Sequence, residues 1–174
     1  RLYVANSNTG TISVVNPTPN AIVTTITLTP CPVGCAPNKV ALSPDGSRLY
    51  VTDDFADLVW VINTTTNTIV ASVSGVQFPE GVAVHPDGSR IYVANVDGTG
   101  AGQVTEISTA SNTVTTSVPV GADPIGVAVD PTGTSVLIVN YIGATVSVAS
   151  TADLTHQVTL PVGGAPATFG QFIA

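Results

Sequence analysis

The fold is decided by residues 79–95, which read PEGVAVHPDGSRIYVAN. Apolar residues alternate with others on both sides of His85-Pro86-Asp87-Gly88, a sequence typical of a tight turn. The stretch therefore predicts two β-strands joined by a hairpin. Similar stretches occupy residues 37–53 and 124–140, the second half alone opens the chain, and a sequence like the first half lies near its end.

The repeat has a nearly constant period. Its second strand carries Tyr3, Tyr50, Tyr92 and Leu137 at the same position, so successive copies are 47, 42 and 45 residues apart. This spacing is typical of one four-stranded blade of a β-propeller. No stretch shows a comparable helical pattern, so the sequence predicts an all-β fold.

The repeat resembles the YVTN family of β-propeller repeats. The resemblance rests on the three near-complete copies quoted above and on the T-[IV]-S-V strands that follow some of them. It covers nearly the whole chain and implies a propeller scaffold. Relatives of this kind include surface-layer proteins, lactonase-like enzymes and domains of redox enzymes, so the resemblance implies no particular ligand.

Counting strands predicts a single propeller domain over residues 1–174 with four blades. The blades are expected at residues 1–28 together with 166–174, and at 37–73, 79–118 and 124–160. The first blade lacks an inner strand and the chain end supplies one, so pairing of the N- and C-terminal strands is expected to close the ring. The alternatives are four repeats of a larger ring, or two chains that share a ring of eight blades.

Composition favours an extracellular or cell-surface protein. Charged residues make up only 9% of the chain and its net charge is −7, which argues against a nucleic-acid partner. No apolar run is long enough to span a bilayer as a helix. The chain contains no methionine, which indicates either a processed form or a part of a longer protein.

Cys31 and Cys35 are the only cysteines, and we expect them to form a disulfide. Closing so short a loop contributes about 2 kcal/mol by the chain-entropy relation. With no further cysteine and no nearby histidine, the pair lacks the ligands of a tetrahedral zinc site. The sequence therefore predicts no metal site and no cofactor.

Propeller topology predicts that several acids gather on one face, where they could hold a glycan, a cation or a protein. Hard oxygen ligands at close spacing would suit Ca²⁺, although the glycine and alternation of a dedicated calcium loop are missing. The alternative is a set of solvated loop acids. The residues are Asp53, Asp54, Asp57, Glu80, Asp97 and Asp123, with Lys39 as the base nearby.

Other candidate contacts lie in loops. Phe55 and Tyr141 are expected to be exposed aromatic contacts, whereas Trp60 is expected to pack between blades. Asn63 begins the single N-x-[ST] sequon and is a possible N-glycosylation site. Asp45 and Asp87 belong to hairpin turns rather than to a catalytic site.

The sequence favours a protein that is not an enzyme. The two histidines, His85 and His156, lie beside no plausible nucleophile, and a narrow four-bladed channel would leave little room for substrate. We therefore expect a structural or adhesive propeller that self-associates into a filament or surface layer, with other copies, glycans or surface proteins as partners. The alternatives are a ligand-binding module and, less favoured, a lactonase-like enzyme using Glu80 and Asp123.

Overall fold

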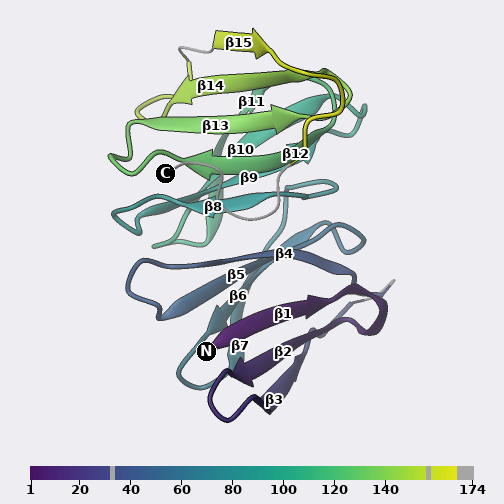
Figure 1. Ribbon diagram of the computed structural model, residues 1–174, viewed down its shortest axis with the longest axis vertical. Coiled ribbons are helices and arrows are strands. Elements are labelled where there is room, and N and C mark those ends of the chain that lie inside the picture. Colours follow the sequence, from purple (N-terminus) through teal and green to yellow (C-terminus); the bar gives the residue numbers. More distant parts are fainter. Residues whose placement is uncertain (32–33, 156–157, 168–174) are drawn as a thin grey trace.

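The computed structural model describes residues 1–31, 34–155 and 158–167, and these form four antiparallel sheets with a single short 3-10 helix (Figure 1). The first sheet contains β1 (Leu2–Asn6), β2 (Thr11–Asn16) and β3 (Ala21–Thr27), with η1 (Ser7–Thr9) between its first two strands. The second contains β4 (Pro37–Leu42), β5 (Arg48–Asp53), β6 (Leu58–Asn63) and β7 (Thr68–Val73). The all-β prediction is confirmed.

The last two sheets repeat the four-strand pattern. The third contains β8 (Val82–Val84), β9 (Arg90–Val96), β10 (Gly102–Ser108) and β11 (Thr113–Pro119). The fourth contains β12 (Pro124–Val129), β13 (Ser135–Asn140), β14 (Thr145–Ser150) and β15 (Val158–Pro161). Each sheet joins its strands in chain order, as the blades of a propeller do, so we call them the first to fourth blades.

The hydrophobic cores lie between the blades rather than within them. One cluster joins Ile12 and Val14 of the first blade to Leu49, Val51 and Trp60 of the second. Two further clusters join the second blade to the third and the third to the fourth. Because successive strand residues point to opposite faces, the second and third blades each bury one set of side chains against the preceding blade and the other set against the following blade.

The tight turns take the structure that the repeat predicts. Asp45 accepts hydrogen bonds from the Ser47 amide and the Ser43 hydroxyl, and Asp87 accepts from the Ser89 amide. In the second, third and fourth blades, the threonine that follows the third strand donates its hydroxyl to the carbonyl of the glycine in the turn between the first two strands. The pairs are Thr64 with Gly46, Thr109 with Gly88, and Thr151 with Gly133.

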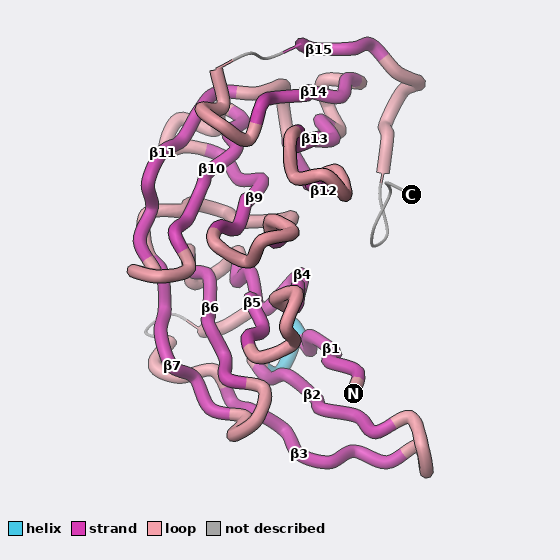
Figure 2. The backbone as a smooth tube through the Cα atoms, turned by 90° about the vertical axis from the view of Figure 1, so that its left-hand side faces the viewer, coloured by secondary structure: helices cyan, strands magenta, loops and turns pink. Residues whose placement is uncertain are grey.

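The four blades follow an arc whose concave side carries the inner strands (Figure 2). The outer strands β3, β7, β11 and β15 follow the convex side. In the described part of the chain, β1 has only β2 as a neighbour in its sheet. The predicted closing strand, residues 166–173, falls mostly on residues 168–174, which lie outside the described ones, so the pairing that closes the ring stays a prediction.

Candidate functional site

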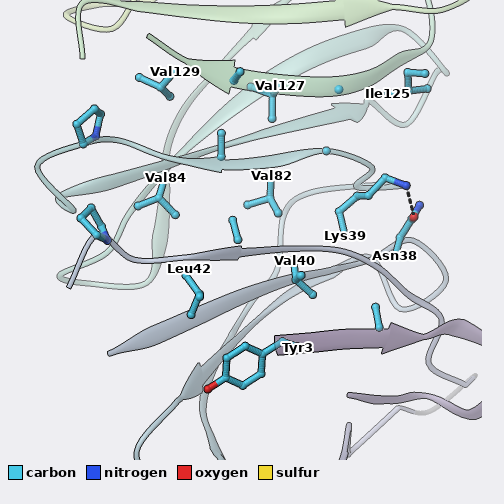
Figure 3. A pocket seen from close by; sticks show the side chains of 18 of the residues that line it. Tyr3, Asn38, Lys39, Val40, Leu42, Val82, Val84, Ile125, Val127 and Val129 are labelled. Atoms are coloured by element: carbon cyan, nitrogen blue, oxygen red, sulfur yellow. Dashed lines mark hydrogen bonds between the residues drawn. The ribbon is translucent and has the colours of Figure 1, made fainter. Parts of the chain in front are cut away.

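A groove follows the concave side of the arc and has a volume of about 760 Å³. Its walls come from the inner strands of the second, third and fourth blades and from β1 (Figure 3). Its principal side chains are aliphatic. They are Val40 and Leu42 from β4, Val82 and Val84 from β8, and Ile125, Val127 and Val129 from β12.

The groove differs from the narrow channel that the sequence predicts for four blades. Glycines let the inner strands approach at one point, where a Cβ on Gly81 would lie 3.0 Å from the Cα of Gly126. Away from this point the inner strands lie farther apart and their aliphatic side chains line the groove. Alternating apolar residues in the first strand of every repeat could have indicated this wall, because one face of those strands has no blade to cover it.

Polar groups at one end of the groove centre on Glu80. The Asn38 amide donates a hydrogen bond of 2.6 Å to the Glu80 carboxylate, and Lys39 Nζ donates to Asn38 Oδ1 over 3.0 Å (Figure 3). Glu80 and Asn38 are half-buried, and Lys39 is exposed. Glu80 and Lys39 thus meet through an amide rather than in a direct ion pair.

Burial raises the pKa of Glu80 above its ordinary value, although the Asn38 hydrogen bond opposes the shift. Repulsion from Asp54 and Asp123 also raises this pKa, and attraction to Lys39 lowers it. Asp54 and Asp123, two of the other predicted acids, therefore lie within electrostatic range of Glu80. A half-buried carboxylate with a raised pKa is a possible proton acceptor or donor.

Asp53 is not part of the exposed face that the sequence predicts, because its side chain is fully buried at the end of β5. Its Oδ1 accepts from the amides of Ala36 and Ala56, at 2.8 and 3.1 Å. Its Oδ2 accepts from the indole N–H of Trp60 at 3.0 Å. The carboxylate therefore holds the cysteine loop, the following turn and the Trp60 side chain together.

Asp57 and Asp97 also hold local structure. Asp57 accepts from the Phe78 amide at 2.8 Å. Asp97 accepts from the hydroxyl and amide of Thr99 and from the Ala101 amide, and the Thr99 hydroxyl is the largest cause of its lowered pKa. Asp57 therefore joins the turn between β5 and β6 to the segment before β8, and Asp97 holds the turn between β9 and β10.

Calcium binding at the predicted acidic face has no assembled ligand set. Among the residues that the structure describes, the single group of three potential metal ligands within 4.8 Å of one another is Cys31, Cys35 and Asp53. The two cysteines form the predicted disulfide, with their Cα atoms 5.6 Å apart, so their sulfurs are already bonded to each other.

The loop aromatics are exposed as predicted. Phe55 is 59% exposed and lies beside Gly34, and Tyr141 is 42% exposed. Trp60 is buried between the first and second blades, also as predicted. The Asn63 side-chain oxygen accepts from the amides of Thr65 and Thr66, so the sequon forms a tight turn between β6 and β7.

His85 is buried and joins two blades. Its Nε2 lies 2.9 Å from the carbonyl oxygen of Gly133, in the hairpin turn of the fourth blade. A histidine that donates to this carbonyl has a structural partner. His156 lies outside the described residues.

Comparison with known proteins supports a β-propeller family, without identifying the YVTN repeat specifically. A family model described as lactonase, 7-bladed beta-propeller, matches residues 62–162, which are 101 of the 174 residues. No curated protein matches. A solved structure of Kuenenia stuttgartiensis hydrazine synthase has a TM-score of 0.70 at 23% sequence identity. The match covers 84% of this chain and 41% of that chain, which shows a shared fold.

Proposed function

The chain belongs to the lactonase family of seven-bladed β-propellers, and we propose that it is a non-enzymatic structural or adhesive member that associates with copies of itself. The observation that carries this proposal is the use of the candidate acids. Asp53, Asp57 and Asp97 hold backbone amides, and the concave wall beside Glu80 is aliphatic. Such a surface suits contact with another molecule better than bond-breaking chemistry.

Adhesive contact is supported by what the surface exposes. Phe55 and Tyr141 are exposed aromatics in loops, and aromatic side chains supply much of the binding energy in protein interfaces. A protein or glycan surface is therefore the partner class that these loops favour.

An extracellular or cell-surface location is part of the proposal. The Cys31–Cys35 disulfide is of a kind that persists in oxidising surroundings. Among the described residues, no helix is long and apolar enough to cross a membrane. Glycosylation at Asn63 would add to this assignment, and mass spectrometry of native material tests it.

Lactone hydrolysis is the second candidate, and Glu80 is the observation that favours it. Its raised pKa and its hydrogen bond to Asn38, which lines the groove, would suit a proton transfer, and the family model carries the name lactonase. The Asn38 amide and Lys39 could contact a substrate oxygen there. The groove residues close to Glu80 include no nucleophile paired with a base.

One assay separates the two candidates. The chain is incubated with simple lactones with and without Ca²⁺, and ring opening is followed by proton release for wild type, Glu80→Gln and the control Asp97→Asn. We expect no turnover above background in any of the three. Turnover that is lost in Glu80→Gln and kept in Asp97→Asn would contradict the proposal and establish the enzyme.

A further inference from the structure

A second cavity lies between the second and third blades, beside the hairpin turns that join their first two strands, and has a volume of about 300 Å³. The two turns form part of its wall, and Thr109 and Asn112 of the third blade form another part. Both blades have a further blade on their other side. Cavities that bind small molecules begin at roughly this volume.

The equivalent junction between the third and fourth blades is closed by three side chains. Arg90 donates to the Thr151 carbonyl over 2.6 Å, and the Tyr92 hydroxyl donates to the same carbonyl over 3.4 Å. The His85 ring reaches the Gly133 carbonyl at 2.9 Å. These contacts fill the space that remains open between the second and third blades.

Two smaller residues leave the junction of the second and third blades open. Ser43 stands at the turn position where the third blade has His85. By strand register, Val61 of the second blade is equivalent to Glu106 of the third. Glu106 forms an ion pair of 3.3 Å with Arg90, and a valine cannot hold an arginine in this way.

Arg48 is the arginine of this open junction, at the position that Arg90 has in the third blade. It is half-buried, and in the part of the chain that the structure describes its guanidinium makes no hydrogen bond and no ion pair. Tyr50 is 3% exposed, and its hydroxyl likewise makes no hydrogen bond to a described residue. A guanidinium has five N–H donors and a phenol has one O–H donor. The cavity therefore presents unused donors to a ligand.

Two ionised carboxylates line the same cavity. Hydrogen bonds, above all from the Ser43 hydroxyl, lower the pKa of Asp45 to about 2. Hydrogen bonds from Ser89 likewise lower the pKa of Asp87 to about 2. Neither carboxylate forms an ion pair with Arg48. The carboxylates repel a simple anion and the guanidinium repels a simple cation, so a ligand with one charge of each sign fits the cavity best.

We propose that this cavity binds a small zwitterion of the α-amino acid class, with its carboxylate on Arg48 and its ammonium group on Asp45 and Asp87. A guanidinium binds a carboxylate through two parallel N–H···O hydrogen bonds. The Tyr50 hydroxyl can donate one more, and the Asn112 amide can bind a polar side chain of the ligand. This binding site goes beyond the proposed function and does not depend on self-association.

The first experiment measures the binding of L-glutamine to the 174-residue chain by a nuclear magnetic resonance titration. Glutaramate lacks only the ammonium group of L-glutamine, γ-aminobutyramide lacks only its carboxylate, and D-glucose tests a ligand with hydroxyls alone. We expect L-glutamine to bind at least about tenfold more tightly than any of the three, because each leaves a charged group of the cavity unpaired. No binding of L-glutamine, or equal binding of glutaramate or D-glucose, would overturn the proposal.

The second experiment repeats the titration with Arg48→Gln and the matched control Arg1→Gln. Arg1 is the equivalent arginine of the first blade, and it donates to the Thr64 carbonyl over 2.9 Å. Both substitutions remove one positive charge. We expect Arg48→Gln to lose at least about tenfold in affinity and Arg1→Gln to bind as wild type does. An equal loss in both variants would show an effect of net charge and would overturn the role given to Arg48.

The third experiment closes the cavity while keeping Arg48. Ser43→His and Val61→Glu together give the second blade the residues that close the next junction, so the new carboxylate can pair with Arg48 as Glu106 pairs with Arg90. We expect a folded protein, by far-ultraviolet circular dichroism, that no longer binds L-glutamine. A folded double variant with wild-type affinity would overturn the proposal. If the double variant does not fold, Arg48→Gln decides alone.

Discussion

The residue that ends the second strand of each blade shows how one position adapts to its partner. In the first and fourth blades it is an asparagine whose amide donates to serine and threonine hydroxyls on the third strand, as Asn140 does to Ser147. In the second blade the third strand offers Trp60, whose indole can only donate. There the residue is Asp53, which can only accept.

This exchange predicts a measurable coupling between Asp53 and Trp60. Asp53→Asn replaces two acceptor oxygens by one, so one of three buried N–H groups loses its acceptor, at a cost of about 1–3 kcal/mol. Trp60→Phe removes the indole donor while keeping an aromatic ring. We expect the cost of Asp53→Asn to fall by about 1 kcal/mol in the Trp60→Phe background. Free energies of unfolding from urea titrations provide the test, and strictly additive costs would contradict it.

Glu80 has the opposite electrostatic situation to Asp97. Burial raises the pKa of Glu80 above its ordinary value of 4.5, so the folded state disfavours the charged carboxylate. The contribution of Glu80 to the stability of the fold is therefore fully present below pH 4.5 and is lost as the pH rises through the pKa of Glu80 in the folded state. We expect Glu80→Gln to raise the free energy of unfolding at pH 7 and to have little effect at pH 4.

Asp97→Asn is the matched control for this pH dependence. Hydrogen bonds lower the pKa of Asp97 below 3.8, so its ionised form contributes stability above that pH and loses it as the pH falls through the folded pKa. We expect Asp97→Asn to destabilise the protein at pH 7, with a smaller effect in acid. If both Glu80→Gln and Asp97→Asn changed the free energy of unfolding in the same direction at pH 7, the opposite pKa shifts assigned to Glu80 and Asp97 would be contradicted.

At the scale of elements, the hairpin turns show how neighbouring blades change the role of one glycine. Gly46 and Gly133 occupy the same turn position, with φ of +70° and +75°. A Cβ on Gly46 would meet no atom within 4 Å. A Cβ on Gly133 would lie 2.8 Å from the His85 ring, which contacts the Gly133 carbonyl.

The two alanine substitutions isolate that interblade contact. Gly46→Ala is expected to cost about 1–2 kcal/mol, the usual cost of a left-handed backbone for a residue with a Cβ. Gly133→Ala should cost about 1–3 kcal/mol more, because it also displaces a packed ring. Chemical denaturation of both variants measures the difference. Equal costs would mean that His85 moves freely and does not join the blades.

The strands were predictable because each is defined locally, by alternating residues and a turn such as Pro44-Asp45-Gly46. Fifteen of the sixteen expected strands occur, the last of them described from Val158, and the sixteenth, at residues 168–173, lies outside the described residues. Exposure was less predictable, because it depends on neighbours distant in the chain. From its place in the sequence Asp53 looks like a surface acid. In the structure it is buried, because the Trp60 side chain and the backbone at Ala36 pack around its carboxylate. The groove was missed because its width depends on the curvature of the whole arc.

At the scale of the molecule, the concave side of the arc carries an aliphatic groove. Exposed apolar surface is typical of an interaction site. This groove and the exposed aromatics Phe55 and Tyr141 are therefore the surfaces through which we expect the protein to contact its partners.

The most direct test of self-association is sedimentation equilibrium of the 174-residue chain. We predict a mass of at least about 35 kDa, twice the 17.5 kDa of one copy. A folded monomer of 17.5 kDa at high protein concentration would contradict the proposed function.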